Sequence, residues 1–363
     1  MGDACDHGDG PLDPVEVLDR IVYLLDRRLE ESRRVRAYAN ARDLVAELDA
    51  DELLARHRDR TLTELPGIGP ATSAVIAEAL DGKVPKKLTE LEATNPVDVG
   101  EGAELRAALR GDCHLHSEWS DGGATIEAMA EAARALGHEY VVLTDHSPRL
   151  TIAHGLDPER LRRQLDVIDD INAAYRRDGV GFRILTGIEV DILDDGSLDQ
   201  EEELLDRLDV VVASVHSKLG MDPKDMTRRM AVAVANPHVD ILGHCTGQKL
   251  PGRMRPIGKS DFAGRVGSSF DADVVFAACA RFDTAVEINC RPERMDPPDQ
   301  LLELALEWGC KLAIDTDAHA PGQLEWQPFG CDRAARHGVT PEQVVNTWRA
   351  EELVEWAASH PTS

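Results

Sequence analysis

Short apolar runs that end in His, Asp or Glu recur through the middle and the end of this chain. The first run closes on His114 and His116, and six more strand-like runs follow it. Nine potential ligands stand at the ends of these runs or in the loop after the first one: His114, His116, Asp121, His146, Glu189, His216, His244, Asp317 and His319. The strands of a β/α barrel end at one common mouth, so side chains that follow them converge there. The pattern therefore predicts a barrel with a metal centre at that mouth.

Helical patterns alternate with the strand-like runs. They cover residues 125–137, 157–179, 226–236, 271–282 and 298–309. Strict alternation of strand and helix implies parallel strands joined by right-handed crossovers. Seven strand candidates favour a seven-stranded barrel over an eight-stranded one, so the predicted fold class is α/β, a (β/α)7 barrel.

Nine ligands exceed the needs of one ion, which favours two or three divalent ions with a carboxylate bridging two of them. Glu189 is the best candidate for that bridge. The mixture of imidazole and carboxylate suits Mn, Zn or Fe. Closely spaced ions activate water and stabilise the oxygens of a phosphoryl displacement. We therefore assign catalytic roles to Glu189, Asp317 and His319.

A phosphate group needs cationic partners in addition to the ions. Loops that follow the ligand-bearing strands carry several cations, although a surface Arg is usually only a solvated charge. Six residues are candidate substrate contacts: Arg149, Lys218, Arg253, Arg255, Asn289 and Arg294.

The chain before the barrel reads as a separate helical domain. Residues 1–13 are predicted to be a flexible tail, 14–98 a helical domain, 99–108 a linker and 109–363 the barrel. Within the helical domain, Gly67, Ile68 and Gly69 form a predicted tight turn before a helix. This turn resembles a helix-hairpin-helix, whose backbone N–H groups hold a DNA phosphate. The alternative is a plain helical turn.

Composition limits the possible partners and locations. The formal net charge of −27 weighs against general DNA binding, because an acidic surface repels phosphate. The seven Cys form no CxxC pair, which is typical of reduced thiols in the cytoplasm. No apolar run approaches the roughly 18 residues of a membrane span, so no membrane partner is expected.

The segments DCHLHSEWSDG, VVLTDHS, TGIEVDI, SVHS, ILGHCTG, VEIN and DTDAH together resemble the PHP (polymerase and histidinol phosphatase) family over residues 110–335. The resemblance implies a distorted seven-stranded barrel with a trinuclear metal site. It implies one ion on His114, His116, Glu189 and Asp317, and a second on Glu189, His216 and His244. A third would take Asp121, His146 and His319, although the family often has His or Glu at the Asp121 position.

The first hundred residues resemble the first domain of bacterial family X DNA polymerases, which also carry a PHP domain. About a dozen linker residues stand where such a polymerase has its palm, so nucleotidyl transfer is not expected. Some relatives have a Schiff-base Lys at the position of Val75, and a lyase activity therefore cannot be inferred here.

Three functions follow from these patterns. The first is a metal-dependent phosphoesterase that acts on nucleic-acid ends, as a 3′–5′ exonuclease or a 3′-end processing enzyme in DNA repair. The second is a phosphatase of a small phosphate monoester, such as a histidinol-phosphate-like or nucleotide-like compound, which the acidic charge favours. The third, and the least favoured, is a non-enzymatic DNA-binding protein whose metals serve stability.

Overall fold

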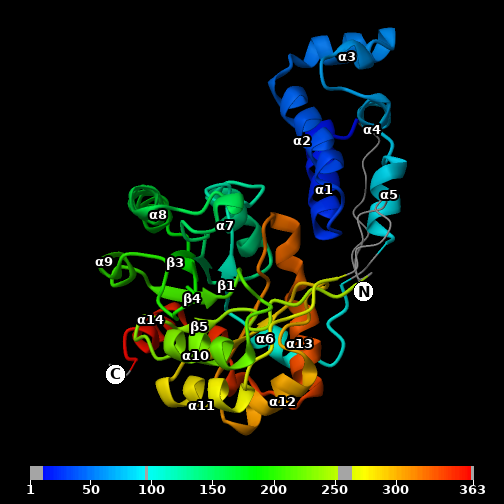
Figure 1. The fold of residues 1–363 in the computed structure, drawn as a ribbon. Helices are drawn as coiled ribbons and strands as arrows, with labels where there is room; N and C mark the ends of the chain where they lie inside the picture. The colour runs from blue at the N-terminus through cyan, green and yellow to red at the C-terminus, as the bar shows by residue number, and fades with distance from the viewer. Residues whose placement is uncertain (1–10, 95–96, 252–263, 361–363) are drawn as a thin grey trace. The chain divides into compact units, whose positions relative to one another are not determined.

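The computed structural model describes residues 11–94, 97–251 and 264–360, which form two compact units. The first unit contains residues 11–94 and is helical; the second contains the other two ranges and includes all the strands (Figure 1). Most of the predicted tail, residues 1–10, lies outside the described residues. Within the described ranges, no helix has the length and apolar character that crossing a membrane requires.

Two helices of the helical unit begin at side-chain caps. Asp13 caps α1 through the N–H of Val15, and Asp49 caps α3 through the N–H of Asp51. Such side-chain caps satisfy N–H groups that the first turn of a helix leaves without partners. The elements are α1 (Pro14–Arg27), α2 (Ser32–Glu47), α3 (Ala50–Asp59), η1 (Leu62–Glu64), α4 (Pro70–Leu80) and α5 (Lys86–Glu92).

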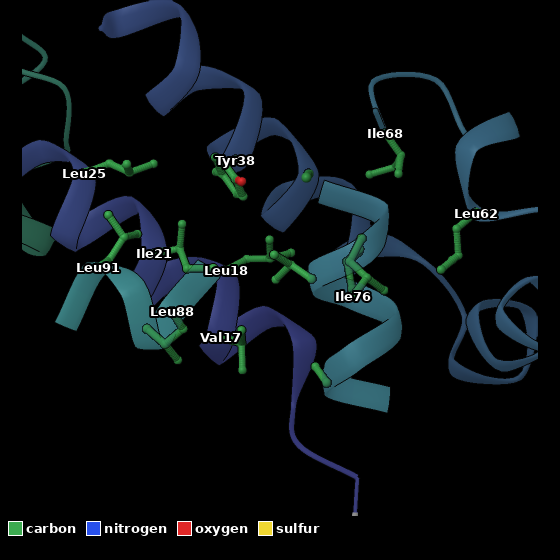
Figure 2. Packing of buried hydrophobic residues seen from close by; sticks show 14 of the residues in the cluster. Val17, Leu18, Ile21, Leu25, Tyr38, Leu62, Ile68, Ile76, Leu88 and Leu91 are labelled. Carbon is green, nitrogen blue, oxygen red and sulfur yellow. The ribbon is translucent and has the colours of Figure 1, made fainter. Parts of the chain in front are cut away.

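Apolar residues from all five helices and from the turns between them meet in one core. Figure 2 shows Leu18, Ile21 and Leu25 of α1 in one cluster with Leu91 of α5 and Ile76 of α4. These five side chains are completely buried. Burial of each side chain stabilises the fold by roughly 1.5–3 kcal/mol. The helical unit therefore has a hydrophobic core of its own.

The predicted glycine turn joins η1 to α4. Gly67 has a φ of +89°, a left-handed conformation that residues with a Cβ rarely adopt. The side chain of Ile68 is buried in the core, and the N–H of Gly69 donates to Thr72 Oγ1 over 3.0 Å. The turn is therefore anchored by an apolar side chain and leads directly into α4.

The second unit is a barrel of seven parallel strands in sequence order, which confirms the predicted fold class. The last strand returns to the first, since Leu115 bridges Ala318 and the N–H of His116 donates to the Ala318 carbonyl. The strands are β1 (Gly111–Leu115), β2 (Tyr140–Leu143), β3 (Arg183–Asp191), β4 (Val210–Ser214), β5 (Ile241–Leu242), β6 (Ala285–Asn289) and β7 (Leu312–Asp315).

A helix follows each of the first six strands and leads into the next one, as Figure 1 shows. These connecting helices are α7 (Ile126–Ala135), α8 (Pro158–Arg177), α9 (Glu202–Leu205), α10 (Pro223–Val234), α11 (Ala272–Phe282) and α12 (Asp299–Glu307). The chain ends with η3 (Pro321–Trp326), α13 (Gln327–Arg336), η4 (Pro341–Gln343), η5 (Val345–Thr347) and α14 (Ala350–Ala357). A short 3-10 turn, η2 (Thr151–Ala153), lies in the loop between β2 and α8.

The segment expected to be a linker, residues 99–108, contains a helix that belongs to the barrel unit. This helix, α6 (Ala103–Ala108), buries Leu105. Before it, the N–H of Glu101 donates to Asp332 Oδ1 over 2.9 Å, and Gly102 lies so close to the Cys331 backbone that a Cβ would not fit. Gly100 and Gly102, which suggested a linker, permit this close packing because they have no Cβ.

Candidate metal centre

All nine predicted ligands lie at the carboxyl ends of the barrel strands. Glu189 lies in β3, and the others follow the ends of β1, β2, β4, β5 and β7 or, for His114, lie within β1. The side chains of Asp121 and His319 are 35% and 22% exposed, and the other seven are 12% exposed or less. The barrel therefore gathers ligands from positions as far apart in the sequence as His114 and His319.

The Glu189 carboxylate lies at the centre of this group. Its Oε2 atom is 3.4 Å from His114 Nε2, 3.6 Å from His116 Nε2 and 2.8 Å from His146 Nδ1. Its Oε1 atom is 3.1 Å from His216 Nε2 and 2.9 Å from His244 Nε2. Each oxygen thus faces a different set of imidazoles, which is the arrangement that a bridging carboxylate requires.

Asp317 and Asp121 border the group on further sides. Asp317 Oδ1 is 3.4 Å from His116 Nε2. Asp121 Oδ1 is 3.4 Å from His146 Nε2 and 3.3 Å from His319 Nε2. The ligand atoms form three overlapping groups that fit ions: His114, His116 and Glu189; His146, Glu189 and His216; and His116, Asp121, His146 and His319.

These groups differ from the ligand sets that the sequence resemblance implies: Asp317 and His244 belong to none of the three, and His146 and His116 each belong to two. His146 presents Nδ1 to Glu189 and Nε2 to Asp121, and His116 lies within reach of both the first and the third group. An imidazole has two nitrogens on opposite edges, so one side chain can face two neighbouring groups. The resemblance gives only Glu189 a place in two sets and does not reveal this sharing of His116 and His146.

Several atoms of the centre are buried without ordinary partners. Within the described chain, both oxygens of Glu189 and the Nε2 atoms of His114 and His116 have no hydrogen-bond partner. Buried polar atoms are normally hydrogen-bonded, because desolvation is otherwise uncompensated. Divalent ions accept lone pairs from imidazole and carboxylate, so this set of unsatisfied atoms fits a metal centre.

The pKa shifts of Glu189 and His116 favour the unprotonated forms that bind metal ions, whereas the shift of His216 favours its protonated form. Burial would raise the pKa of Glu189, but His216, His114 and His146 lower it well below its ordinary value, so the carboxylate is ionised. Burial, together with His319 and His146, lowers the pKa of His116 well below its ordinary value. Burial lowers the pKa of His216, but Glu189 and Asp191 outweigh this and raise it to about 9. In the ion-free protein His216 therefore holds a proton that an ion would displace.

Sequence reasoning missed two acids that orient the ligands. Glu287 in β6 is fully buried; its Oε1 lies 2.6 Å from His114 Nδ1, and its Oε2 accepts the backbone N–H of His244 over 2.5 Å. Asp191 Oδ1 accepts the backbone N–H of His216 over 3.2 Å and lies 3.5 Å from His216 Nδ1. An acid beside the second ring nitrogen, as at His114 and His216, fixes the tautomer and the orientation of a ligand. A charged residue inside the apolar VEIN run was the signal available for Glu287, since it shares a strand face with Asn289.

His319 is held by the loop that follows β6. Its Nδ1 atom is 2.9 Å from the Asp317 carbonyl oxygen, and Arg291 Nη1 donates to the same oxygen over 2.7 Å. Arg291 Nη1 also lies 2.9 Å from His319 Nδ1, and His319 Nε2 lies 3.3 Å from Asp121 Oδ1. Arg291 also lies over the ring of Trp326, which restrains the guanidinium.

The predicted phosphate contacts fall into three kinds. Asn289 Nδ2 donates to Asp317 Oδ2 over 3.2 Å, and Arg294 Nε lies 3.1 Å from the same oxygen, so both lie at the centre. Arg149 Nε is 3.7 Å from Asp191, whereas the exposed Lys218 pairs with Asp194. The remaining two candidates, Arg253 and Arg255, lie outside the described residues.

The glycine turn of the helical unit borders a cavity of about 580 Å³. Backbone of Gly67 and Gly69 lines it, and Arg34 and Lys87 contribute the cationic side chains. Ile68 contributes no side chain there because that side chain packs into the core. The cavity thus combines a helix N-terminus with two cations, a combination that suits an anion.

Fold and site together define a class of protein: a parallel β/α barrel that gathers imidazoles and carboxylates for divalent ions at the carboxyl ends of its strands. Residues 112–244 match the family model of the PHP domain. The chain therefore contains a PHP domain, as the order of its sequence motifs predicts.

Comparison with characterised sequences gives relatives of two kinds. The chain is 39% identical over 247 residues to the "DNA polymerase/3'-5' exonuclease PolX" of Bacillus subtilis, covering 68% of this chain but only 40% of that protein. It is 29% identical over 251 residues to a "Probable phosphatase" of Thermoanaerobacter sp., covering 65% of this chain and 89% of the relative. Among solved structures, the zinc-containing histidinol phosphate phosphatase of Lactococcus lactis aligns with a TM-score of 0.43 at 18% identity, over 64% of this chain and 94% of that one.

Proposed function

We propose that this protein is a metal-dependent phosphoesterase that acts on nucleic-acid ends, as a 3′–5′ exonuclease or 3′-end processing enzyme. The observation that carries the hydrolase assignment is the Glu189 carboxylate, whose two oxygens face five imidazoles. The relatives named as phosphatases and as an exonuclease support the same class of reaction.

The residues of the site have distinct parts in this proposal. Divalent ions, Mn, Zn or Fe, would activate water and neutralise charge on the phosphoryl oxygens. Glu189, Asp317, Asp121 and the six imidazoles would hold them. Asn289 and Arg294 border Asp317 and would orient the phosphoryl group, since Arg294 Nη1 is buried and has no hydrogen-bond partner among the described residues.

Two features of the helical unit support a nucleic-acid substrate. One is the cavity at the glycine turn, with Arg34 and Lys87 beside the N-terminus of α4. The other is charge: residues 11–94 carry 13 Lys and Arg against 17 Asp and Glu, so most of the net −27 lies outside this unit. The repulsion that weighs against DNA binding is therefore weakest where the predicted DNA contact lies.

The test uses the full chain with Mn²⁺ and a 3′-labelled oligonucleotide. His116→Ala and Asp317→Ala should each abolish release of 3′ nucleotides while circular dichroism shows a retained fold. Undiminished hydrolysis in both variants would reject the metal mechanism. Lys87→Gln should raise KM for the oligonucleotide, whereas Lys86→Gln, next to it but 84% exposed and outside the cavity, should not.

The second candidate is a phosphatase of a small phosphate monoester. The "Probable phosphatase" relatives align over most of their own length, and the acidic composition favours a small substrate. A panel of sugar, nucleotide and amino-alcohol phosphates, assayed beside the oligonucleotide, separates the two candidates by their kcat/KM. Metal binding without hydrolysis of any of these substrates would favour the non-enzymatic alternative. A cytoplasmic location stays a prediction that rests on the reduced thiols.

A further inference from the structure

Asp145 lies between β2 and the ligand His146 and is almost completely buried. Four donors converge on its carboxylate. Oδ1 accepts the Ser117 N–H over 2.9 Å and the Ser120 hydroxyl; Oδ2 accepts the Ser117 hydroxyl and Gln164 Nε2, both over 2.6 Å. No atom of this carboxylate is left to serve as a ligand, so its contribution is to hold other residues.

Three of these four donors belong to the turn that presents Asp121. Ser117 also closes the turn through its carbonyl, which accepts the N–H groups of Ser120 and Gly122. Gly122 lies so close to the Ser117 backbone that a Cβ would clash with it. The turn therefore has one compact shape, and the buried carboxylate of Asp145 fixes its inner side to the end of β2.

Asp121 depends on such support more than the other ligands do. It comes from a loop and is 35% exposed, whereas Glu189 is part of a strand and fully buried. Its partners in the group are His146, the neighbour of Asp145 in the chain, and His319, whose carbonyl accepts the Gly123 N–H over 2.7 Å. Asp145 thus connects directly to one ligand of this group and, through the turn, to a second.

We propose that Asp145 is the positioning residue of the Asp121, His146 and His319 ion: it fixes the distance between Asp121 and His146 and so sets the occupancy of that ion. This inference rests on the metal centre of the proposed function. Outer hydrogen-bond partners of ligands change metal affinity by roughly 10–100-fold. Loss of the Asp145 carboxylate should therefore weaken one ion and leave the Glu189-bridged ions in place.

The experiment measures Mn²⁺ stoichiometry and affinity by calorimetry and by elemental analysis of the full chain, independently of any phosphate ester. Asp145→Asn should lose one ion, or bind it at least about tenfold more weakly, and Asp121→Asn should lose the same ion. Asp169→Asn, an exposed change of the same kind on α8, should match the wild type. An Asp145→Asn variant with the wild-type ion number and affinities overturns the proposal, as does one that loses every ion.

A second variant keeps the test decisive if Asp145→Asn does not fold. Ser120→Ala removes one hydrogen bond from the turn and should weaken the same ion by less than about tenfold. Unchanged affinity for that ion in Ser120→Ala overturns the proposal. If the wild-type protein binds no Mn²⁺ at all, the metal centre of the proposed function fails instead, which is a separate outcome.

Discussion

Glu287 Oε1 and His114 Nδ1 are 2.6 Å apart in the fully buried interior of the barrel. The contact places a proton on Nδ1 and leaves His114 Nε2 facing Glu189 Oε2 at 3.4 Å. The other Glu287 oxygen accepts the backbone N–H of His244, so one carboxylate orients the His114 ring and fixes the chain at His244, whose imidazole faces the other oxygen of Glu189. The centre therefore consists of ligands and of a layer of acids beneath them.

Glu287→Gln should reduce Mn²⁺ affinity by roughly 10–100-fold, because an amide cannot accept hydrogen bonds on both of its polar atoms. Calorimetric titration of the purified variant measures the change. Glu307→Gln, on the exposed side of α12, is the matched control and should bind Mn²⁺ as the wild type does. Equal affinities in both variants would show that Glu287 has no part in the centre.

Glu189→Gln should lower kcat by roughly three orders of magnitude or more, because a carboxamide offers one oxygen and cannot bridge two ions. Elemental analysis should find fewer ions per chain than in the wild type. The predicted effect is on ion number, so added Mn²⁺ should not restore the rate. Full recovery at high Mn²⁺ would argue against a bridging role.

Metal affinity should rise with pH. The pKa of His216 is raised to about 9 in the ion-free protein, so its imidazole is protonated below that pH. Binding of an ion through His216 displaces this proton, and affinity should fall by up to about tenfold for each pH unit below 9. Titrations at about pH 6.5 and about pH 8.5, in buffers with different ionisation enthalpies, measure the affinity and the protons released. Affinity that is independent of pH would contradict this protonation.

Gly67→Ala should destabilise the chain by roughly 1–2 kcal/mol, because a Cβ at a positive φ meets its own backbone. Gly69→Ala is the matched control: its φ is −92°, and a Cβ would have open space around it. The free energies of unfolding from urea titrations compare the two. A similar loss of unfolding free energy in both variants would mean that the positive φ of Gly67 is not the cause of the destabilisation.

Much of the fold could be predicted from local patterns. The alternation of apolar runs with helical segments predicted seven parallel strands, and the structure confirms them. The shape of the 99–108 segment could not be predicted, because α6 depends on contacts with Asp332 and Cys331, more than two hundred residues away. Glycine and acidic residues look like a linker when their packing partners are unknown.

The sequence by itself determined which residues would face the mouth of the barrel, because strand periodicity and parallel order bring strand ends to one edge. Only the tertiary structure decided which atoms meet. The division of five imidazoles between the two Glu189 oxygens, the double use of His146, and the support from Glu287 and Asp145 depend on side-chain directions that spacing does not encode. Ligand identity is a property of each strand, whereas the geometry of the centre follows from packing the strands against one another.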